Sequence, residues 1–156
     1  MTDTNKWVIF DLDGTLADID IRRKLATKSN GKIDWDIFFS PKLVSEDEPN
    51  IPVIKMAQTL AEAGYMIAIF SGRSKSTDKT TRAWLSKHRV PFHLLKMRPT
   101  EHPFKYMPDE KLKSDWFDEL FPGGVDVMCV FDDRNKVVDM WRSKNITCMQ
   151  VAPGDF

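Results

Sequence analysis

Short apolar runs alternate with longer polar stretches along most of the chain. Most of these runs are apolar at consecutive positions rather than at every second one, which is typical of strands buried on both faces of a sheet. Their alternation with helix-patterned stretches predicts an α/β fold, in which a mainly parallel central sheet lies between two layers of helices. The predicted strands are residues 7–10, 66–70, 92–95, 127–131 and 147–151.

Several of the polar stretches carry apolar residues on one helical stripe, which indicates helices that pack one face against the sheet. The first is opened by Pro52 and closed by Gly64, residue types that favour a helix start and a helix end. Together with the strands, these helices predict a three-layer, Rossmann-like arrangement. The stripes are Val53, Ala57, Leu60 and Ala61, then Leu112, Trp116, Phe117 and Leu120, then Val137, Val138 and Trp141.

The length of 156 residues fits one ordinary domain, so we expect residues 1–156 to form a single unit. The stretch from about 17 to 50 is the least regular part of the chain and contains Asn30-Gly31 and the acidic segment SEDEPN. We interpret this stretch as a small cap-like insertion rather than a second domain.

The chain carries 23 basic and 23 acidic residues, which argues against a purely electrostatic nucleic-acid binder but leaves room for a local basic patch. No apolar run approaches the roughly 18 residues of a membrane span, and no signal peptide is visible, so we expect a cytoplasmic protein without a membrane partner. Cys129 and Cys148 lie in apolar runs and are expected to be reduced core thiols. His88, His93 and His102 show no metal-binding spacing and are expected at the surface or in packing roles.

The first predicted strand ends in Asp11-Leu12-Asp13-Gly14-Thr15, which places two carboxylates two positions apart. Strand alternation starts both side chains on the same side of the sheet, and Gly14 allows the backbone to turn away tightly. Ligands of open α/β sheets bind outside the carboxyl ends of the strands. We therefore expect the chemistry of this protein at that edge.

The fourth predicted strand also ends in carboxylates, Asp132 and Asp133. Taken alone, these two aspartates could also cap the N-terminus of the following helix. Carboxylates that converge at one sheet edge repel one another unless a hard cation holds them, and Mg²⁺ prefers such an oxygen-only environment. The combination predicts a magnesium site.

The second predicted strand ends in Ser71-Gly72-Arg73, which offers a hydroxyl, a close backbone approach and a guanidinium. These groups suit phosphate oxygens, although Ser and Gly are also common in turns. Lys113 lies near the start of the helix before the fourth strand, and from spacing alone Lys111 competes with it. The whole set predicts metal-assisted phosphoryl transfer.

The order DLDGT, SGR, lysine and DD resembles motifs one to four of the haloacid dehalogenase superfamily of phosphotransferases, which implies the fold of that superfamily. The tail FDDRNKVVDMWRSKNITCMQVAPGDF resembles more narrowly the 3′-phosphatase half of bacteriophage polynucleotide kinase/phosphatases. The likeness extends from Val8 to Phe156 and is weakest between residues 17 and 50. No GxxxxGK[ST] phosphate loop occurs, so kinase activity is not expected.

The resemblance implies that Asp11 is the nucleophile and Asp13 the general acid and base. It favours Lys113 over Lys111 and implies that Lys113 and Ser71 bind the transferring phosphoryl group. The acid and base role requires the pKa of Asp13 to lie above that of Asp11, whose ionised form the metal favours. The implied Mg²⁺ site comprises Asp11, Asp13 through its carbonyl oxygen, Asp132 and Asp133, and the implied substrate-binding residues are Thr15, Arg22, Gly72, Arg73 and Asp109.

The first hypothesis is a Mg²⁺-dependent polynucleotide 3′-phosphatase that acts through an aspartyl-phosphate and leaves 3′-hydroxyl ends on DNA or RNA. The insertion looks too short to close over a small substrate, and an open site admits a polymer end. The alternatives are a nucleotidase or other small-molecule phosphatase, and a non-catalytic domain that works beside a separate kinase or ligase. A basic track for a phosphodiester backbone is expected from Arg22, Arg23, Lys24, Lys28, Lys96, Arg98, His102 and Lys105, although each cluster also fits a solvated face.

Overall fold

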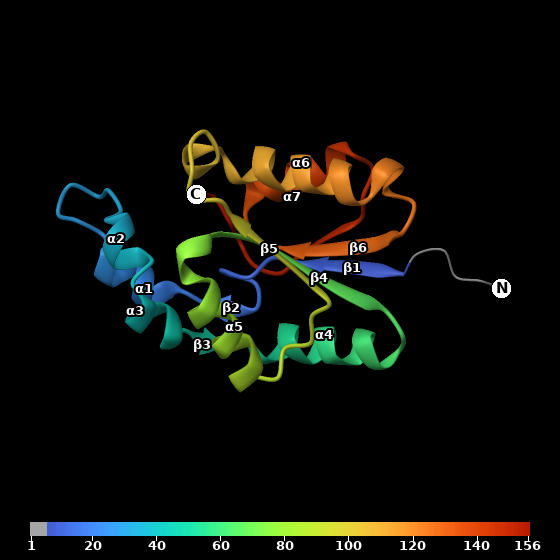
Figure 1. The fold of residues 1–156 in the computed structure, drawn as a ribbon, viewed down its shortest axis with the longest axis horizontal. Coiled ribbons are helices and arrows are strands. Elements are labelled where there is room, and N and C mark those ends of the chain that lie inside the picture. Colours follow the sequence, from blue (N-terminus) through green and yellow to red (C-terminus); the bar gives the residue numbers. More distant parts are fainter. Residues whose placement is uncertain (1–5) are drawn as a thin grey trace.

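The computed structural model describes residues 6–156 and shows a central sheet between two helical layers (Figure 1). The five strands of this sheet are all parallel and follow the order β5-β4-β1-β6-β7. Their bounds are β1 Trp7–Phe10, β4 Met66–Ser74, β5 Leu94–Arg98, β6 Val127–Asp132 and β7 Cys148–Gln150. The predicted α/β fold with a mainly parallel sheet is therefore confirmed.

Two helices lie on each face of the sheet. Figure 1 shows α4 (Ile51–Glu62) and α5 (Asp78–Lys87) below it and α6 (Asp109–Leu120) and α7 (Asn135–Ser143) above it. The three predicted stripes lie on α4, α6 and α7. Among residues 6–156, no helix is both long and apolar enough to cross a membrane.

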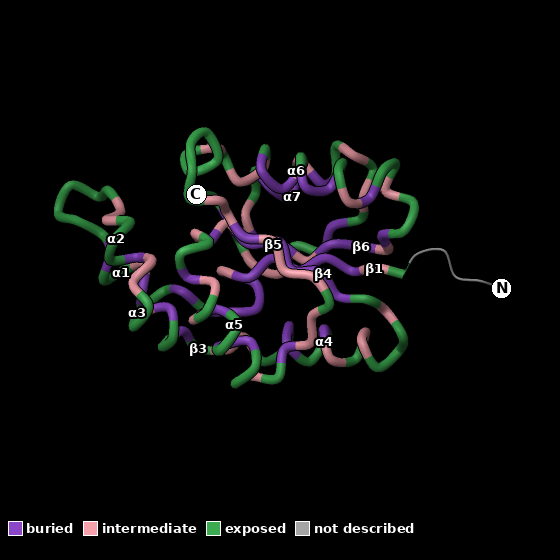
Figure 2. Tube along the Cα trace, in the orientation of Figure 1, coloured by how far each residue is buried: buried purple, intermediate pink, exposed green. Residues whose placement is uncertain are grey.

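Alternate residues of the strands pack into two separate hydrophobic cores, because successive side chains point to opposite faces of the sheet. Val8, Phe10 and Ile67 pack on the side of α4 and α5, whereas Ile9 and Phe70 pack on the side of α6 and α7. Figure 2 shows the central strands buried along most of their length. This burial on both faces explains the continuous apolar runs in the sequence.

The bounds of two predicted strands were wrong. β5 begins at Leu94 rather than residue 92, and it runs on through Lys96 to Arg98. It is an edge strand whose residues are mostly half-buried, so polar side chains are tolerated and hide its end. β4 continues through the Ser71-Gly72-Arg73 segment, and its register with β5 shifts between Ser71 and Ser74.

The segment between β1 and α4 leaves the sheet at its carboxyl end. A small antiparallel pair, β2 (Ala17–Asp18) and β3 (Glu48–Pro49), forms its base. The three short helices α1 (Asp20–Ala26), α2 (Trp35–Phe38) and α3 (Pro41–Ser45) lie between these strands and project beyond the sheet (Figure 1). We call residues 17–50 the cap segment.

Candidate active site

The carboxylates predicted from two distant parts of the sequence meet where β1 and β6 end. The two strands are parallel neighbours, and the backbone N–H of Asp11 donates to the carbonyl oxygen of Phe131 at 2.9 Å. Carboxylate oxygens of Asp11, Asp132 and Asp133 lie within 4.8 Å of one another, and all three residues are buried. The sheet topology thus brings together residues that are more than a hundred positions apart.

Lys113 is the cation that faces this carboxylate cluster. Its Nζ donates to Asp11 Oδ1 at 2.7 Å and to Asp132 Oδ2 at 3.0 Å, and its side chain is 3% exposed. Lys111 instead is exposed and pairs with Asp115 on the surface of the same helix. The choice between the two lysines is therefore settled by position, because α6 turns Lys113 toward the sheet edge.

The cluster holds more negative than positive charge. Burial raises the pKa of Asp11 well above its usual value, and the charges of Asp132 and Asp133 raise it further. The positive charge of Lys113 lowers this pKa but does not cancel the rise. Burial likewise raises the pKa of Asp133, with Asp132 adding to the effect. The carboxylates of Asp11 and Asp132 in turn outweigh the effect of burial on Lys113 and raise the pKa of its ammonium.

These properties fit a hard divalent cation. Three buried carboxylates supply oxygen ligands, and the raised pKa values of Asp11 and Asp133 are what burial and crowding produce where added positive charge would be favourable. Asp11, Asp132 and Asp133 are the residues that would hold Mg²⁺. Arg22 and Arg73 hold Oδ1 of Asp13, which fits the expectation that its backbone carbonyl, rather than its side chain, contacts the metal.

Thr15 and Gly14 support the cluster from the loop after β1. The Thr15 hydroxyl lies 3.1 Å from Asp11 Oδ2 and 3.4 Å from Asp133 Oδ1, and the residue is fully buried. In the protein alone the Thr15 hydroxyl therefore contacts the carboxylates, and the substrate-binding role expected from the sequence stays a prediction. Gly14 has φ +84°, and a Cβ there would collide with the Asp133 carboxylate.

A second ion cluster surrounds Asp13. Arg22 Nη2 and Arg73 Nε donate to Asp13 Oδ1 at 2.8 and 2.7 Å. Both arginines also donate to Asp47, Arg22 through Nε at 3.0 Å and Nη2 at 2.9 Å, and Arg73 through Nη2 at 2.8 Å. Arg73 completes its contacts by donating to the Thr81 hydroxyl at 3.1 Å. We call Asp13, Arg22, Arg73 and Asp47 the arginine cluster.

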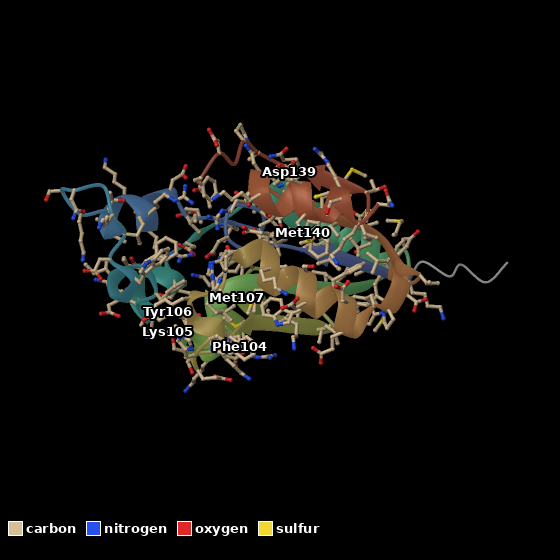
Figure 3. The ribbon with its side chains drawn as sticks, turned by 90° about the horizontal axis from the view of Figure 1, so that it is seen from above. Phe104, Lys105, Tyr106, Met107, Asp139 and Met140 are labelled. Carbon is tan, nitrogen blue, oxygen red and sulfur yellow. The ribbon has the colours of Figure 1, made fainter. Side chains whose placement is uncertain are left out.

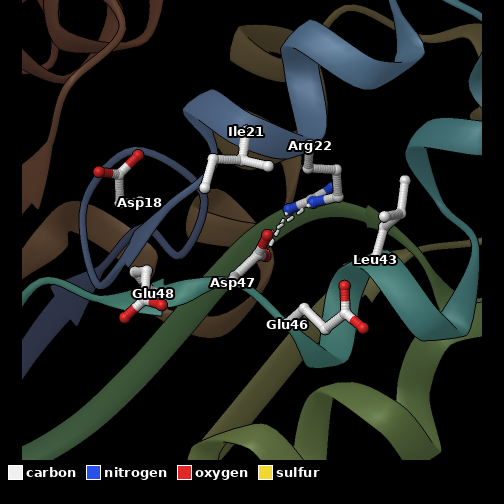
Figure 4. A pocket seen from close by; sticks show the side chains of 7 residues that line it. All are labelled: Asp18, Ile21, Arg22, Leu43, Glu46, Asp47 and Glu48. Atoms are coloured by element: carbon white, nitrogen blue, oxygen red, sulfur yellow. Dashed lines mark hydrogen bonds and ion pairs between the residues drawn. The ribbon is translucent and has the colours of Figure 1, made fainter.

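Asp47 is the member of this cluster that sequence reasoning missed. It lies in the acidic segment SEDEPN, which has no periodic pattern, and yet its side chain is only 2% exposed. Figure 4 shows it bound to Arg22 in the lining of a small pocket of about 40 Å³ that Glu46 and Glu48 also line. Trp84 on α5 fixes the backbone there by donating from Nε1 to the Asp47 carbonyl oxygen at 2.8 Å. The cap segment is therefore fastened to the sheet domain at this point.

The pKa values of Asp11 and Asp13 shift in opposite directions in the protein without a metal. Burial by itself would raise the pKa of Asp13, but the guanidinium groups of Arg73 and Arg22 outweigh it and hold the pKa below the usual value. The pKa of Asp11 is raised instead. The expectation that Asp13 is the weaker acid concerns a site in which Mg²⁺ favours the ionised form of Asp11, and it stays a prediction for that site.

Ser71 and Gly72 lie on the adjacent strand, β4. The Ser71 side chain is buried, and its hydroxyl accepts from the backbone N–H of Arg73 at 3.1 Å. A Cβ at Gly72 would lie 2.7 Å from Asp109 Oδ1, so glycine is required for Asp109 to approach the strand. Asp109 pairs with Arg98 and, at 3.0 Å, with Arg134. The expected residues Ser71, Gly72, Arg73 and Asp109 therefore lie together beside the carboxylate cluster.

Two residues of the expected basic track are engaged elsewhere, and the rest of the track stays a prediction. Arg22 is buried in the arginine cluster and Arg98 is tied to Asp109, so neither is free to follow a phosphodiester backbone. His102 and Lys105 are exposed, as are Lys24 and Lys28 on the cap segment. The histidine prediction is confirmed, since His88 packs against Trp84, His93 accepts a hydrogen bond from the Ile67 N–H, and His102 lies at the surface. Both cysteines are buried and free, as expected.

Comparison with known proteins connects this geometry to one family. Residues 5–156 match the model of the polynucleotide kinase PNKP phosphatase domain. A protein of Autographa californica nuclear polyhedrosis virus, described as a bifunctional polynucleotide kinase/RNA ligase, is 35% identical over 141 residues, which are 89% of this chain and 18% of the viral protein.

Solved structures give the same relationship. A chain of the Pnkp1/Rnl/Hen1 RNA repair complex has a TM-score of 0.77 at 33% identity, and the match covers 97% of this chain and 44% of that chain. A predicted phosphatase from Clostridium acetobutylicum has a TM-score of 0.70 at 14% identity over 94% of this chain and 84% of its own, which supports the fold alone. The chain thus spans less than half the length of the viral relative and of the repair-complex chain.

Proposed function

This chain belongs to the family of polynucleotide kinase phosphatase domains and is a phosphatase of the haloacid dehalogenase superfamily, and we propose that it removes terminal 3′-phosphates from nucleic acids. The observation that carries this proposal is the position of Asp11. It directly follows β1, and its carboxylate accepts from the Lys113 ammonium at 2.7 Å and lies beside the carboxylates of Asp132 and Asp133, where a phosphoryl group can be attacked while its charge is neutralised. The reaction would be hydrolysis of a phosphomonoester to leave a 3′-hydroxyl.

Asp11 acts as the nucleophile in this proposal. Its carboxylate oxygen attacks phosphorus, the bond from phosphorus to the sugar oxygen breaks, and an aspartyl-phosphate forms. Mg²⁺ bound by Asp11, Asp132 and Asp133 would supply positive charge to offset repulsion between this carboxylate and the phosphate dianion. Lys113 adds a second positive charge beside Asp11, and Ser71 contributes a hydroxyl from within β4.

Asp13 acts as the acid and then the base. Within residues 6–156 both guanidinium groups bind Oδ1 of Asp13, and no hydrogen bond reaches Oδ2. That second oxygen is left for the leaving sugar oxygen, to which Asp13 gives a proton, and then for the water that hydrolyses the aspartyl-phosphate. Arg22 and Arg73 hold the carboxylate in this orientation and present positive charge to the substrate.

The chain works in this proposal as one phosphatase domain, residues 1–156, with the cap segment as a small insertion. The cap helices are short and stand beside the carboxyl edge of the sheet (Figure 1), which favours an open site over an enclosed one. An open site admits the end of a DNA or RNA strand. The relatives act in chains or complexes that include kinases and ligases, and we propose a separate kinase or ligase as the partner that uses the 3′-hydroxyl. The buried free cysteines fit the cytoplasmic location expected from the sequence.

The experiment is phosphate release from matched oligonucleotides phosphorylated at the 3′ or the 5′ end and from 3′- and 5′-mononucleotides, each with Mg²⁺ and with a chelator. The blank is Asp11→Asn, and the surface variant Lys111→Ala is the matched control for Lys113→Ala. We expect Mg²⁺-dependent release chiefly from the 3′-phosphorylated oligonucleotide, lost with Asp11→Asn and Lys113→Ala and kept with Lys111→Ala.

Three other results would each contradict the proposal. Preference for mononucleotides would make the protein a nucleotidase. Binding of nucleic acid ends without phosphate release would make it a non-catalytic partner domain. Release that does not depend on Mg²⁺ would remove the metal from the mechanism.

A further inference from the structure

The loop between β5 and α6, residues 99–108, carries exposed aromatic side chains beside the site. Phe104 is 38% exposed and Tyr106 is 74% exposed, whereas large apolar side chains usually find cover. Figure 3 shows Phe104, Lys105 and Tyr106 grouped together on one turn, and the gold segment in Figure 1 places this turn at the same end of the sheet as the cap segment. None of these side chains has a role in the proposed chemistry.

Arg98 fastens this loop to the site. Its guanidinium donates to the carbonyl oxygens of Gly72 at 3.1 Å and Phe104 at 2.8 Å, and it pairs with Asp109. The same side chain therefore contacts the backbone beside Ser71, the helix start at Asp109, and the turn that carries the aromatic rings. The turn is held at a fixed place relative to the phosphoryl-binding groups.

The chemistry of the turn suits a nucleotide. Lys105 Nζ lies 5.5 Å from the centroid of the Tyr106 ring, and the His102 ring lies 6.4 Å from it, so a positive charge and a second ring accompany the exposed π-face. Proteins bind single strands by combining such charges with aromatic faces on which bases stack. Trp35 on the cap segment is also exposed, but its ring already stacks on Phe39 at 5.8 Å with an interplanar angle of 20°.

We propose that Tyr106, supported by Phe104 and Lys105, stacks on a base at the 3′ end of a single-stranded DNA or RNA while the terminal phosphate occupies the site. The proposal rests on the proposed function for the identity of the ligand. In this proposal, contact with the turn makes the protein prefer polymer ends to small phosphoesters. Stacking on an aromatic face does not require a particular base sequence.

A binding assay tests the stacking proposal without any need for phosphate release. The Asp11→Asn protein is titrated into a 3′-phosphorylated oligonucleotide with 2-aminopurine near its 3′ end, whose fluorescence is quenched by stacking. We expect quenching with Asp11→Asn and with Asp11→Asn/Tyr106→Phe, and about ten-fold weaker binding without quenching for Asp11→Asn/Tyr106→Ala. Equal affinity and quenching for the Tyr106→Ala protein would overturn the proposal, as would the absence of binding by Asp11→Asn.

Steady-state kinetics distinguish the stacking proposal from the proposed phosphatase function. In the otherwise unchanged protein, Tyr106→Ala should raise KM for the 3′-phosphorylated oligonucleotide about ten-fold with kcat nearly unchanged, and should have no effect on the same strand with abasic terminal positions. Val125→Ala, an exposed site just before β6 at the other end of the sheet, is the control. Release of 3′-phosphate that Tyr106→Ala does not alter would overturn the stacking proposal alone. Stacking in the binding assay without any release would overturn the phosphatase proposal alone.

Discussion

Asp11 and Asp13 are two positions apart, yet they belong to ion clusters of opposite character. The carboxylate cluster sets Asp11, Asp132 and Asp133 against the single ammonium of Lys113. The arginine cluster sets Asp13 and Asp47 against two guanidinium groups. One cluster therefore lacks positive charge, and the other is balanced within the protein.

This difference separates two tasks. Burial and crowding raise the pKa of Asp11, which leaves a place for a cation, whereas the arginines lower the pKa of Asp13 and hold its carboxylate in one orientation. The unbalanced cluster is suited to take up a metal and a phosphate in turn. The balanced cluster is suited to position a proton carrier and to fasten the cap segment, since buried charges are tolerated when they are paired and hydrogen-bonded.

The largest expected effect is that of Asp11→Asn. The amide is a poor nucleophile, so phosphate release should fall by at least about a thousand-fold. Thermal stability in the absence of Mg²⁺ should stay the same or rise, because one of three crowded carboxylates has been neutralised. Phosphate release and thermal unfolding of the same preparation check both parts. Retained activity would remove Asp11 from the mechanism, and a loss of stability would mean that the cluster is balanced after all.

Asp47→Asn tests the balanced cluster. It leaves two buried guanidinium groups against one carboxylate, and the free energy of unfolding should drop by about 3–5 kcal/mol, the usual range for breaking a buried ion pair. Denaturation in urea measures this loss. Glu46→Gln, at the exposed neighbouring position, is the matched control and should change stability by less than about 0.5 kcal/mol. Equal effects of the two substitutions would show that the contacts of Asp47 with Arg22 and Arg73 do not stabilise the fold.

Addition of Mg²⁺ should distinguish the two clusters. A cation that binds only the folded protein should add about 2.7 kcal/mol at a hundred times its Kd, so the melting temperature should rise with Mg²⁺ concentration. Asp133→Asn should shift this response to higher Mg²⁺ concentration, and Asp47→Asn should leave the concentration dependence unchanged. The same response in Asp133→Asn and the unmodified protein would place the cation elsewhere.

Gly72→Ala should have the smallest of these effects. The added Cβ comes within 2.7 Å of Asp109 Oδ1 and pushes that carboxylate away from Arg98 and Arg134, so kcat/KM should fall about ten-fold. In an Asp109→Ala background the same substitution should cost much less, because its steric partner is gone. Additive effects in this double-mutant cycle would show that Gly72 and Asp109 act independently.

The parts of this protein that follow from local sequence were predicted well. The apolar runs marked the parallel strands, and the carboxylates after two of them marked the edge where Asp11 and Asp132 meet, because parallel strands end on one side of a sheet. β5 was misplaced since an edge strand need not be apolar throughout. The side-chain order within each motif, such as DLDGT, was enough to suggest the family that residues 5–156 match.

The arginine cluster shows what local sequence does not reveal. Asp47 lies in a run of acidic residues that looks like solvated loop, and only the pairing of β2 with β3 carries it to Arg22 and Arg73. The lowered pKa of Asp13 was hidden for the same reason, since the DLDGT motif does not show which arginines contact its carboxylate. A pKa depends on the charges around a group in space, and those charges come from distant parts of the chain.

The most direct test of the account is to find where phosphorus is held during turnover. The protein is mixed with a 3′-phosphorylated oligonucleotide and Mg²⁺, quenched in acid within one turnover, and digested for mass spectrometry. The account predicts a phosphoryl adduct on Asp11, absent with a chelator and absent in Asp11→Asn. An adduct on another residue, or phosphate release with no adduct at any time, would contradict it.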